Sequence, residues 1–177
     1  MGNAFEIKLQ QGKVGEDLIS RWLIGRGWNI LPVYEQSINT GKGPRVFSAE
    51  TNLVAPDALA FKSGKFMWVE AKTKSLFSFH RITGRYVTGI DLRHYNHYLH
   101  VVGISSTPLY LFFLHTGLGE SDDELEKDAG LFFGDIQILK DCENHRSDKW
   151  GKSGMVYWAK ESLTKAASIE QVNKRTP

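Results

Sequence analysis

Two apolar runs lie at the centre of the chain, at residues 53–62 and 65–72, and their composition predicts two β-strands. Ser63 and Gly64 separate them, and such a pair favours a two-residue hairpin turn. In that hairpin the numbers of facing residues sum to 127, whereas a three-residue turn would shift the register by one. Apolar residues stand on both faces of the ladder, which is typical of an interior strand pair.

A helix is predicted upstream of the hairpin, over residues 13–26. Val14, Leu18 and Trp22 follow one another at four-residue steps and form one apolar face. Residues 1–12 are expected to be a loosely tied lead-in to this helix.

An edge strand and a long loop are predicted between this helix and the hairpin. Residues 28–36 are largely apolar but contain Pro32, which confines a strand to a sheet edge or a bulge. Residues 37–52 are rich in glycine and small polar residues and predict a loop, and loops of this length are often functional.

A smaller hairpin is predicted downstream, over residues 75–89, with its turn at Thr83 and Gly84. Aromatic and basic residues alternate along it. Phe77 and Phe79 are expected to pack inward.

A second helix is predicted over residues 91–105, with Asp91 as its N-cap. Its expected core stripe comprises Leu92, Tyr95, Leu99 and Val102. Residues 109–115 are strongly apolar and predict a strand in the sheet interior. Residues 117–130 are acidic and predict a loop or a short helix.

Shorter elements are predicted in the last part of the chain. Residues 131–139 predict a strand with a bulge at Gly134, and residues 141–154 predict a polar loop. Residues 155–158 begin a short strand, and residues 161–172 predict a terminal helix.

The order of elements predicts an α/β fold with a mixed central β-sheet flanked by helices. A chain of 177 residues, 41% of them hydrophobic, suits one globular domain. The single Cys142 excludes an internal disulfide and a multi-cysteine zinc site. No stretch resembles a signal peptide or a membrane span, so a cytoplasmic protein is expected.

Three charged residues meet in the predicted central hairpin. Asp57 faces Glu70 in the two-residue register, and Lys72 lies on the same face because side chains alternate along a strand. Two facing carboxylates in an apolar strand pair repel each other, so a cation is expected between them. Either Lys72 or a divalent ion such as Mg²⁺ meets that need, and a purely structural ion pair is the simpler interpretation.

Asp57, Glu70 and Lys72 belong to a longer pattern that resembles a known nuclease motif. Pro56 and Asp57, a spacer with a turn, and then Glu70, Ala71 and Lys72 resemble the motif of the PD-(D/E)XK nuclease superfamily. The letters alone are common, and their placement on two apolar strands joined by a tight turn makes the match specific. The resemblance implies a metal-dependent DNA endonuclease. In it Asp57, Glu70 and the Ala71 carbonyl hold Mg²⁺, or Mn²⁺ in its place, while Lys72 orients or helps deprotonate the attacking water.

The resemblance covers about residues 13–114, where it implies a restriction-endonuclease-like core of order αβββαβ, and residues 115–177 form an extension. In branches that resemble archaeal Holliday-junction resolvases, a first helix begins with a glycine-rich turn and carries a glutamate that assists metal binding. Residues 12–16 match that description, so the resemblance assigns this role to Glu16. From the helical wheel alone, Glu16 lies at the rim of the apolar face, where a solvated glutamate is the ordinary interpretation.

The second helix carries the other polar candidates. Related nucleases often place a glutamine of this helix at the site; it is absent here, and Asn96 or Tyr95 is the expected substitute. His94, His97 and His100 follow one another at three-residue steps, which turn each ring away from the last. They therefore do not predict a zinc site.

Charge is unevenly distributed along the chain. Residues 72–100 hold five basic residues and one acid, whereas residues 101–140 hold seven acids and two basic residues. This favours a phosphate-binding groove near the acid pair, and ordinary surface scatter explains it equally well. The candidates for contact with DNA are Lys42, Arg45, Lys74, His80, Arg81 and Arg85. The acidic residues 117–130 should lie away from DNA.

Two other functions stay open: a catalytically silent nucleic-acid-binding module of the same fold, and a protein–protein module whose acid pair is structural. The sequence sets neither the substrate's structure nor the number of metal ions. It also leaves the oligomeric state open. Many relatives cut as dimers because two strands need two sites, which makes a homodimer a possible assembly.

Overall fold

The fold is seen in a computed structural model that describes residues 2–33, 44–47, 52–151 and 153–174, with side chains from residue 12 onward. Its helices are α1 (Gly2–Ile24), α2 (Leu92–Ser105), α3 (Ile136–Asp141) and α4 (Ile169–Asn173), with a 3₁₀ turn at Lys160–Ser162. Its strands are β1 (Asn29–Pro32), β2 (Arg45–Phe47), β3 (Asn52–Val54), β4 (Ala58–Lys62), β5 (Lys65–Lys74), β6 (Ser78–His80), β7 (Arg85–Asp91), β8 (Leu109–His115), β9 (Gly130–Asp135), β10 (Glu143–Ser147), β11 (Met155–Ala159) and β12 (Thr164–Ala167).

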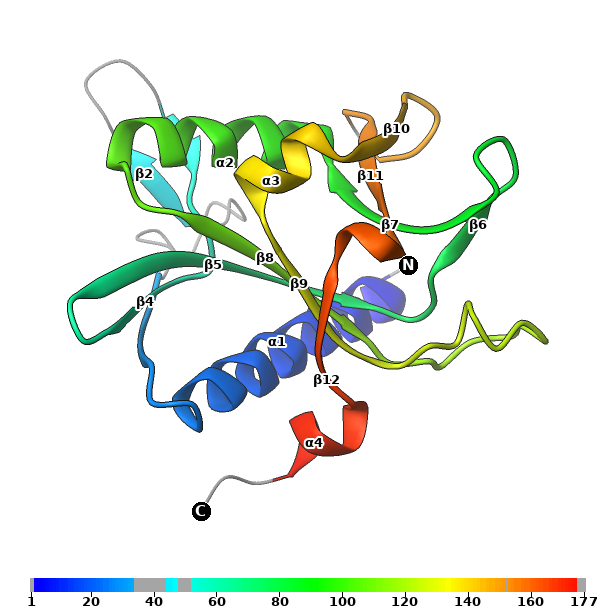
Figure 1. Cartoon of the computed structure of the whole chain (residues 1–177), viewed down its shortest axis with the longest axis horizontal. Coiled ribbons are helices and arrows are strands. Elements are labelled where there is room, and N and C mark those ends of the chain that lie inside the picture. The colour runs from blue at the N-terminus through cyan, green and yellow to red at the C-terminus, as the bar shows by residue number, and fades with distance from the viewer. Residues whose placement is uncertain (1, 34–43, 48–51, 152, 175–177) are drawn as a thin grey trace.

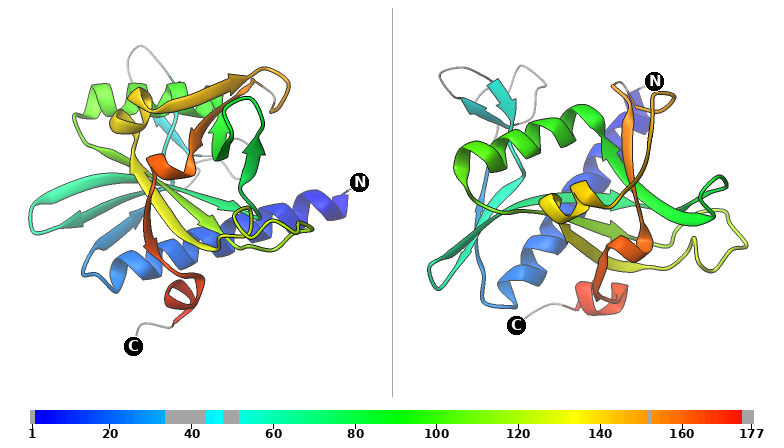
Figure 2. Two further views of the ribbon diagram at one scale, coloured as in Figure 1. Left: turned by 45° about the vertical axis from the view of Figure 1, so that its right-hand side comes forward. Right: turned by 45° about the horizontal axis from the view of Figure 1, so that its top comes forward.

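A six-stranded sheet of order β1-β4-β5-β8-β9-β12 forms the centre of the molecule (Figure 1). Its β5–β8 pair is parallel and its other pairs are antiparallel, so the predicted mixed sheet is confirmed. One core packs α1 against this sheet, and a second core packs α2 and β11 against the opposite face. The two helices therefore lie on opposite sides of the sheet (Figure 2).

The central hairpin has the predicted two-residue turn and register. Lys62 pairs with Lys65, and the pairing continues in step to Ala58 and Val69. Ser63 and Gly64 have φ angles of 49° and 78°, and two left-handed residues in succession match the right-handed twist of the flanking strands.

The prediction that this hairpin is buried on both faces is wrong at its tip. Ala60 and Met67 face the α1 core, but Phe61 and Phe66 on the other face are 37% and 51% exposed. Their rings stack on each other with centroids 5.9 Å apart. The tip extends past the end of the neighbouring strand β8, which pairs with β5 only from Trp68 onward.

The first helix is longer than predicted. It begins at Gly2, so the expected loose lead-in is helical over residues 2–12. The sequence there contains no proline, and Gly12 lowers helix stability by only about 1 kcal/mol relative to alanine.

The second helix confirms the predicted cap, since the Asp91 side chain accepts a hydrogen bond of 2.9 Å from the Arg93 N–H. The predicted core stripe is confirmed in part: Tyr95 is buried, and Leu92, Leu99 and Val102 are partly buried and pack against the same core, but Tyr98 and Val101 are the other fully buried residues. Residues three apart are neighbours on a helix surface, so Tyr95, Tyr98 and Val101 share the face of α2 that packs against the sheet.

A second sheet, of order β10-β11-β7-β6, was not predicted. The small hairpin of β6 and β7 is confirmed, with a left-handed turn at Gly84. Phe77 is buried as expected, but Phe79 is 45% exposed, so its inward packing was wrong. The predicted polar loop at 141–154 contains β10, because the antiparallel edge of β11 is open to pair with it.

Three further expectations were wrong. The predicted loop at 37–52 contains β2, which pairs with β3. The strand predicted over 131–139 ends at Asp135, whose side chain caps α3 through the Gln137 N–H, and Gly134 pairs in register without a bulge. The terminal helix predicted over 161–172 begins only after the Ser168 capping box, because β12 pairs with the edge of β9.

The predicted interior strand is confirmed as β8, which ends at the buried His115. That ring stacks on Phe77 with a centroid distance of 3.7 Å, and burial lowers its pKa to about 3. No helix in the described part of the chain is long and apolar enough to cross a membrane.

Candidate active site

Asp57 and Glu70 meet across the central hairpin, as the register predicted. Asp57 directly precedes β4, and its Oδ2 accepts a hydrogen bond of 2.8 Å from the Ala71 N–H of β5. Its carbonyl accepts a second bond of 2.9 Å from the Val33 N–H. Both bonds fix the carboxylate beside the middle of β5.

Glu70 is a fully buried acid paired with a lysine. It has no solvent-exposed surface, and its Oε1 forms an ion pair with the Lys72 ammonium group. Neither carboxylate oxygen of Glu70 has a hydrogen-bond donor of good geometry among the described residues. A buried carboxylate normally accepts several hydrogen bonds or ion pairs. Glu70 can therefore accept a further cation or hydrogen-bond donor.

The positive charge near Asp57 and Glu70 is too small to hold the pKa of Asp57 at its ordinary value. Burial, followed by the neighbouring charge of Glu70, raises the pKa of Asp57 from 3.8 to about 7, although Lys72 and the Ala71 N–H act against this rise. Burial acts to lower the pKa of Lys72, but the Glu70 and Asp57 carboxylates outweigh it and hold that pKa above its ordinary value. Lys72 therefore keeps its charge at neutral pH.

A close contact between α1 and β5 brings Glu16 to the site. A side chain at Gly15 would place its Cβ 1.8 Å from the Thr73 Oγ1, so glycine is required where the helix crosses the strand. Glu16 follows directly, and it lines a cavity of about 350 Å³ together with Asp57 and Ala71. Burial, then the charge of Asp57, raises the pKa of Glu16. Glu16 is thus within electrostatic reach of Asp57 while retaining exposed surface.

The α2 residue at the site is Tyr98, which the sequence analysis missed. Its buried hydroxyl lies beside Glu70, and burial followed by that carboxylate raises the pKa of Tyr98. The predicted substitutes do not reach the site: Asn96 is exposed, and the Tyr95 hydroxyl donates to Glu143 at 2.7 Å. The three-residue step from Tyr95 to Tyr98 was the available signal, because it keeps both rings on the buried line of α2.

The histidines of α2 have separate surroundings. His94 lies one turn before Tyr98, with ring centroids 6.0 Å apart, and burial followed by the charge of Lys72 lowers its pKa. His97 Nδ1 accepts a hydrogen bond of 2.9 Å from the Val54 N–H and joins α2 to β3. Among the described residues, no three His, Cys, Asp or Glu side chains form a group able to hold a metal ion.

The donor set nevertheless fits a hard divalent cation. Two adjacent carboxylates, Asp57 and Glu70, and the Ala71 carbonyl are oxygen ligands of the kind that Mg²⁺ prefers. Apart from the Lys72 ion pair, Glu70 accepts no hydrogen bond of good geometry among the described residues, and together with the raised pKa of Asp57 this indicates a deficit of positive charge. Glu16 does not join this carboxylate pair as a third member of a metal-binding group among the described residues.

The residues predicted to contact DNA are not gathered in one place. Lys74 continues β5 beyond Lys72, and burial, followed by the charge of Lys72, lowers its pKa to about 8. Arg45 lies half-buried on β2, while Lys42 lies outside the described residues. His80, Arg81 and Arg85 belong to the β6–β7 hairpin.

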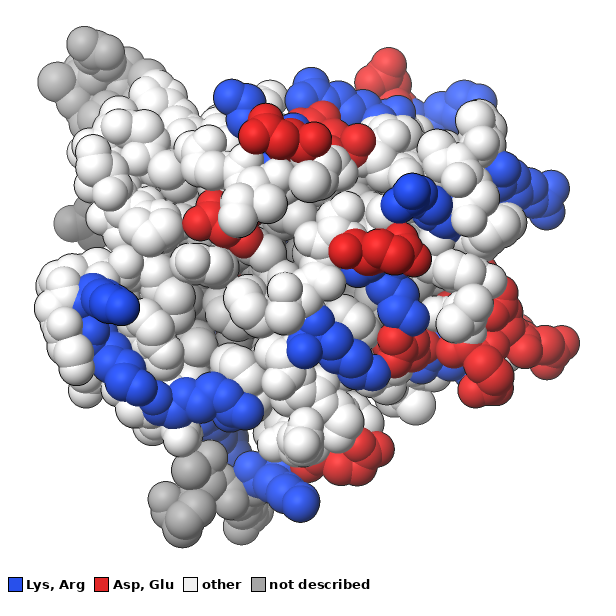
Figure 3. Space-filling view, in the orientation of Figure 1, with Lys and Arg blue, Asp and Glu red and all other residues white. Residues whose placement is uncertain are grey.

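The acidic segment of residues 117–130 contacts that hairpin. The Tyr86 hydroxyl donates to Asp123 at 2.5 Å, and the Phe77 N–H donates to the Glu126 carbonyl at 2.9 Å. In the space-filling view, acidic and basic side chains accordingly share the right-hand part of the molecule (Figure 3). The acidic segment therefore lies beside residues that were predicted to contact DNA, and its expected place away from DNA stays a prediction.

Comparisons with known proteins show the fold. No family model and no curated protein matches the chain. Among solved structures, the chain is similar to Hjc, a Holliday junction resolvase from the archaeal hyperthermophile Archaeoglobus fulgidus, with a TM-score of 0.50 and 10% identity over 85% of this chain and 90% of that one. It is also similar to D212, a nuclease from a fusselovirus, with a TM-score of 0.40 and 13% identity over 93% and 88%. The TM-score of the second match is too low to carry an argument. The first confirms the fold class, while membership of the PD-(D/E)XK superfamily stays a prediction.

Proposed function

We propose that the chain is a metal-dependent DNA endonuclease whose site comprises Asp57, Glu70 and Lys72. The observation that carries this proposal is the buried acid pair, in which Glu70 has no hydrogen-bond donor of good geometry and Asp57 has a pKa of about 7. A purely structural ion pair requires one acid and one lysine. The second acid has a physical reason in this place if the pair binds a cation.

Each residue has a distinct part in this function. Asp57, Glu70 and the Ala71 carbonyl would hold Mg²⁺, which supplies polarisation of the scissile phosphate and a lower pKa for the attacking water when it is bound. Mn²⁺ would substitute. The Ala71 N–H holds the Asp57 carboxylate in place. Lys72 stays protonated and stabilises negative charge that develops on the phosphate.

The fold similarity to a Holliday junction resolvase supports branched DNA as one substrate to test. Wild-type protein is incubated in Mg²⁺ with supercoiled plasmid, linear duplex, single-stranded DNA and a four-way junction. The Asp57→Ala variant and a chelator serve as controls. We expect cleavage of at least one substrate by the wild type only. Equal degradation by both proteins would refute the assignment, and tight metal-independent binding without nicking would indicate a silent binding module.

Cutting two strands needs two sites, so a homodimer is the assembly this function favours.

Glu16 is expected to assist without being essential. Replacing Glu16 with glutamine should lower the cleavage rate by roughly 10-fold, because it removes about 1.4 kcal/mol of electrostatic support for a cation at Asp57. The matched control is Glu124→Gln, the same chemical change on an exposed glutamate outside the cavity that Glu16 lines. Single-turnover rates at saturating Mg²⁺ measure both. Equal rates for the two variants would remove Glu16 from the site.

A further inference from the structure

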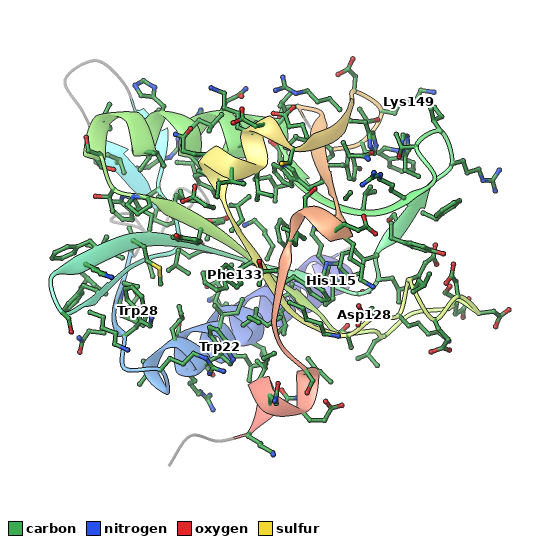
Figure 4. All side chains as sticks on the ribbon, viewed as in Figure 1. Trp22, Trp28, His115, Asp128, Phe133 and Lys149 are labelled. Carbon is green, nitrogen blue, oxygen red and sulfur yellow. The ribbon has the colours of Figure 1, made fainter. Side chains whose placement is uncertain are left out.

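A second cavity, of about 580 Å³, lies between the C-terminal half of α1 and the sheet. Most of its wall is aromatic, and the rings are those of Trp22, Trp28, Phe66, Tyr110, Phe112 and Phe133. This aromatic pocket has the volume of an ordinary small-ligand site. Trp22, Trp28 and Phe133 mark its position near the lower end of α1 in Figure 4.

The wall of the aromatic pocket is preformed by contacts between its own rings. Phe112 and Phe133 stack with centroids 5.5 Å apart, and Trp22 packs edge-on against Phe112 at 6.4 Å. The Trp22 Nε1–H is buried and has no acceptor among the described residues. Because this N–H is buried, Trp22 contributes its ring and not a donor to the pocket wall.

The rim of the aromatic pocket is cationic. Arg26 and Lys65 line it, and the Lys62 ammonium group donates to the Arg26 carbonyl at 2.6 Å beside them. The Arg26 guanidinium lies over the Trp22 ring, 3.6 Å from its centroid. No carboxylate is among the described residues that line the pocket. Figure 3 shows Lys and Arg side chains in a band along this lower left part of the molecule.

We propose that the aromatic pocket binds an unpaired nucleobase of a DNA strand, whose backbone phosphates contact Arg26 and Lys65. Aromatic rings that stack on a planar group and a positive rim together match a base tied to an anionic backbone. An apolar peptide would cover the rings but would desolvate both cations without pairing them. The proposal rests on the proposed function for DNA as ligand, and it adds that the substrate has unpaired bases.

The test is binding of a short single strand that carries one 2-aminopurine, a fluorescent base whose emission falls when it stacks. The full chain is used, with chelator present so that no cutting occurs. The wild type should quench the probe, and Arg26→Glu combined with Lys65→Glu should weaken binding on the order of 10-fold or more. The matched control combines Lys140→Glu with Lys149→Glu, which makes the same change in net charge at exposed lysines; Lys149 lies far from Trp22 in Figure 4. The control should change the affinity less than two-fold.

Further arms separate the base from the backbone. Phe66→Ser should reduce the quenching. The variant protein should still fold, because the Phe66 side chain is 51% exposed. A strand of equal length with an abasic site in place of the probe should bind more weakly. Equal affinity for the abasic strand, equal effects of the two charge-reversal pairs, or comparable binding of a free nucleoside monophosphate would each overturn the proposal. The proposal would also be overturned if the wild type were a dimer, and if Phe66→Ser made it monomeric without lowering its affinity for DNA.

The two proposals fail separately. Plasmid cleavage in Mg²⁺ depends on Asp57 and reports the proposed function, whereas quenching in chelator reports the aromatic pocket. A wild type that quenches the probe but nicks no substrate would refute the endonuclease and retain the pocket.

Discussion

Replacing Glu70 with glutamine is expected to lower the DNA cleavage rate by about 1,000-fold or more. Glutamine keeps the volume of this fully buried side chain but removes its charge. A site that has lost one of its two carboxylates holds a divalent cation poorly and loses several kcal/mol of transition-state stabilisation, where each 1.4 kcal/mol is a factor of ten in rate. Single-turnover cleavage across a range of Mg²⁺ concentrations measures the loss.

Glu124→Gln is the control for this change, because Glu124 is exposed in the acidic segment. Its cleavage rate should equal that of the wild type, and circular dichroism should show both variants folded. A Glu70→Gln protein that cuts within three-fold of the wild-type rate would show that Glu70 is structural only.

Replacing Asp57 with asparagine is expected to stabilise the protein at pH 8 in the absence of metal. The pKa of Asp57 is about 7 in the folded chain, whereas the ordinary pKa of an aspartate is 3.8. Between these values the unfolded chain releases the proton while the folded chain holds it, so stability falls as pH rises. The full penalty applies above pH 7 and is on the order of 4 kcal/mol.

Asparagine carries no such penalty and still accepts the bond from the Ala71 N–H. Its melting temperature at pH 8 should exceed the wild-type value by roughly 8–16 °C, and the two should converge near pH 4. Mg²⁺ should raise the melting temperature of the wild type alone. Calorimetry at both pH values measures this, with Asp122→Asn at an exposed aspartate as the surface control. An equal gain at both pH values would show that the effect is not ionisation of Asp57.

The site was predictable to the extent that it lies on adjacent strands. Asp57, Glu70 and Lys72 belong to one hairpin whose register depends on the Ser63-Gly64 turn, and the structure confirms that register. The roles of these residues remain proposals. Tyr98 was not predictable in the same way, because helix periodicity places both Tyr95 and Tyr98 inward without saying which one lies over β5.

Local patterns by themselves determined the central hairpin, the Asp91 cap of α2 and the interior strand β8, since turns, caps and apolar runs act between residues close in the chain. Only the tertiary structure decided the second sheet and the edge strand β12, because a short polar segment becomes a strand when a distant strand offers it an open edge. The same holds for Glu16 and the aromatic pocket. Their positions follow from the crossing of α1 over β5 at Gly15, a contact between segments nearly sixty residues apart that no local pattern encodes.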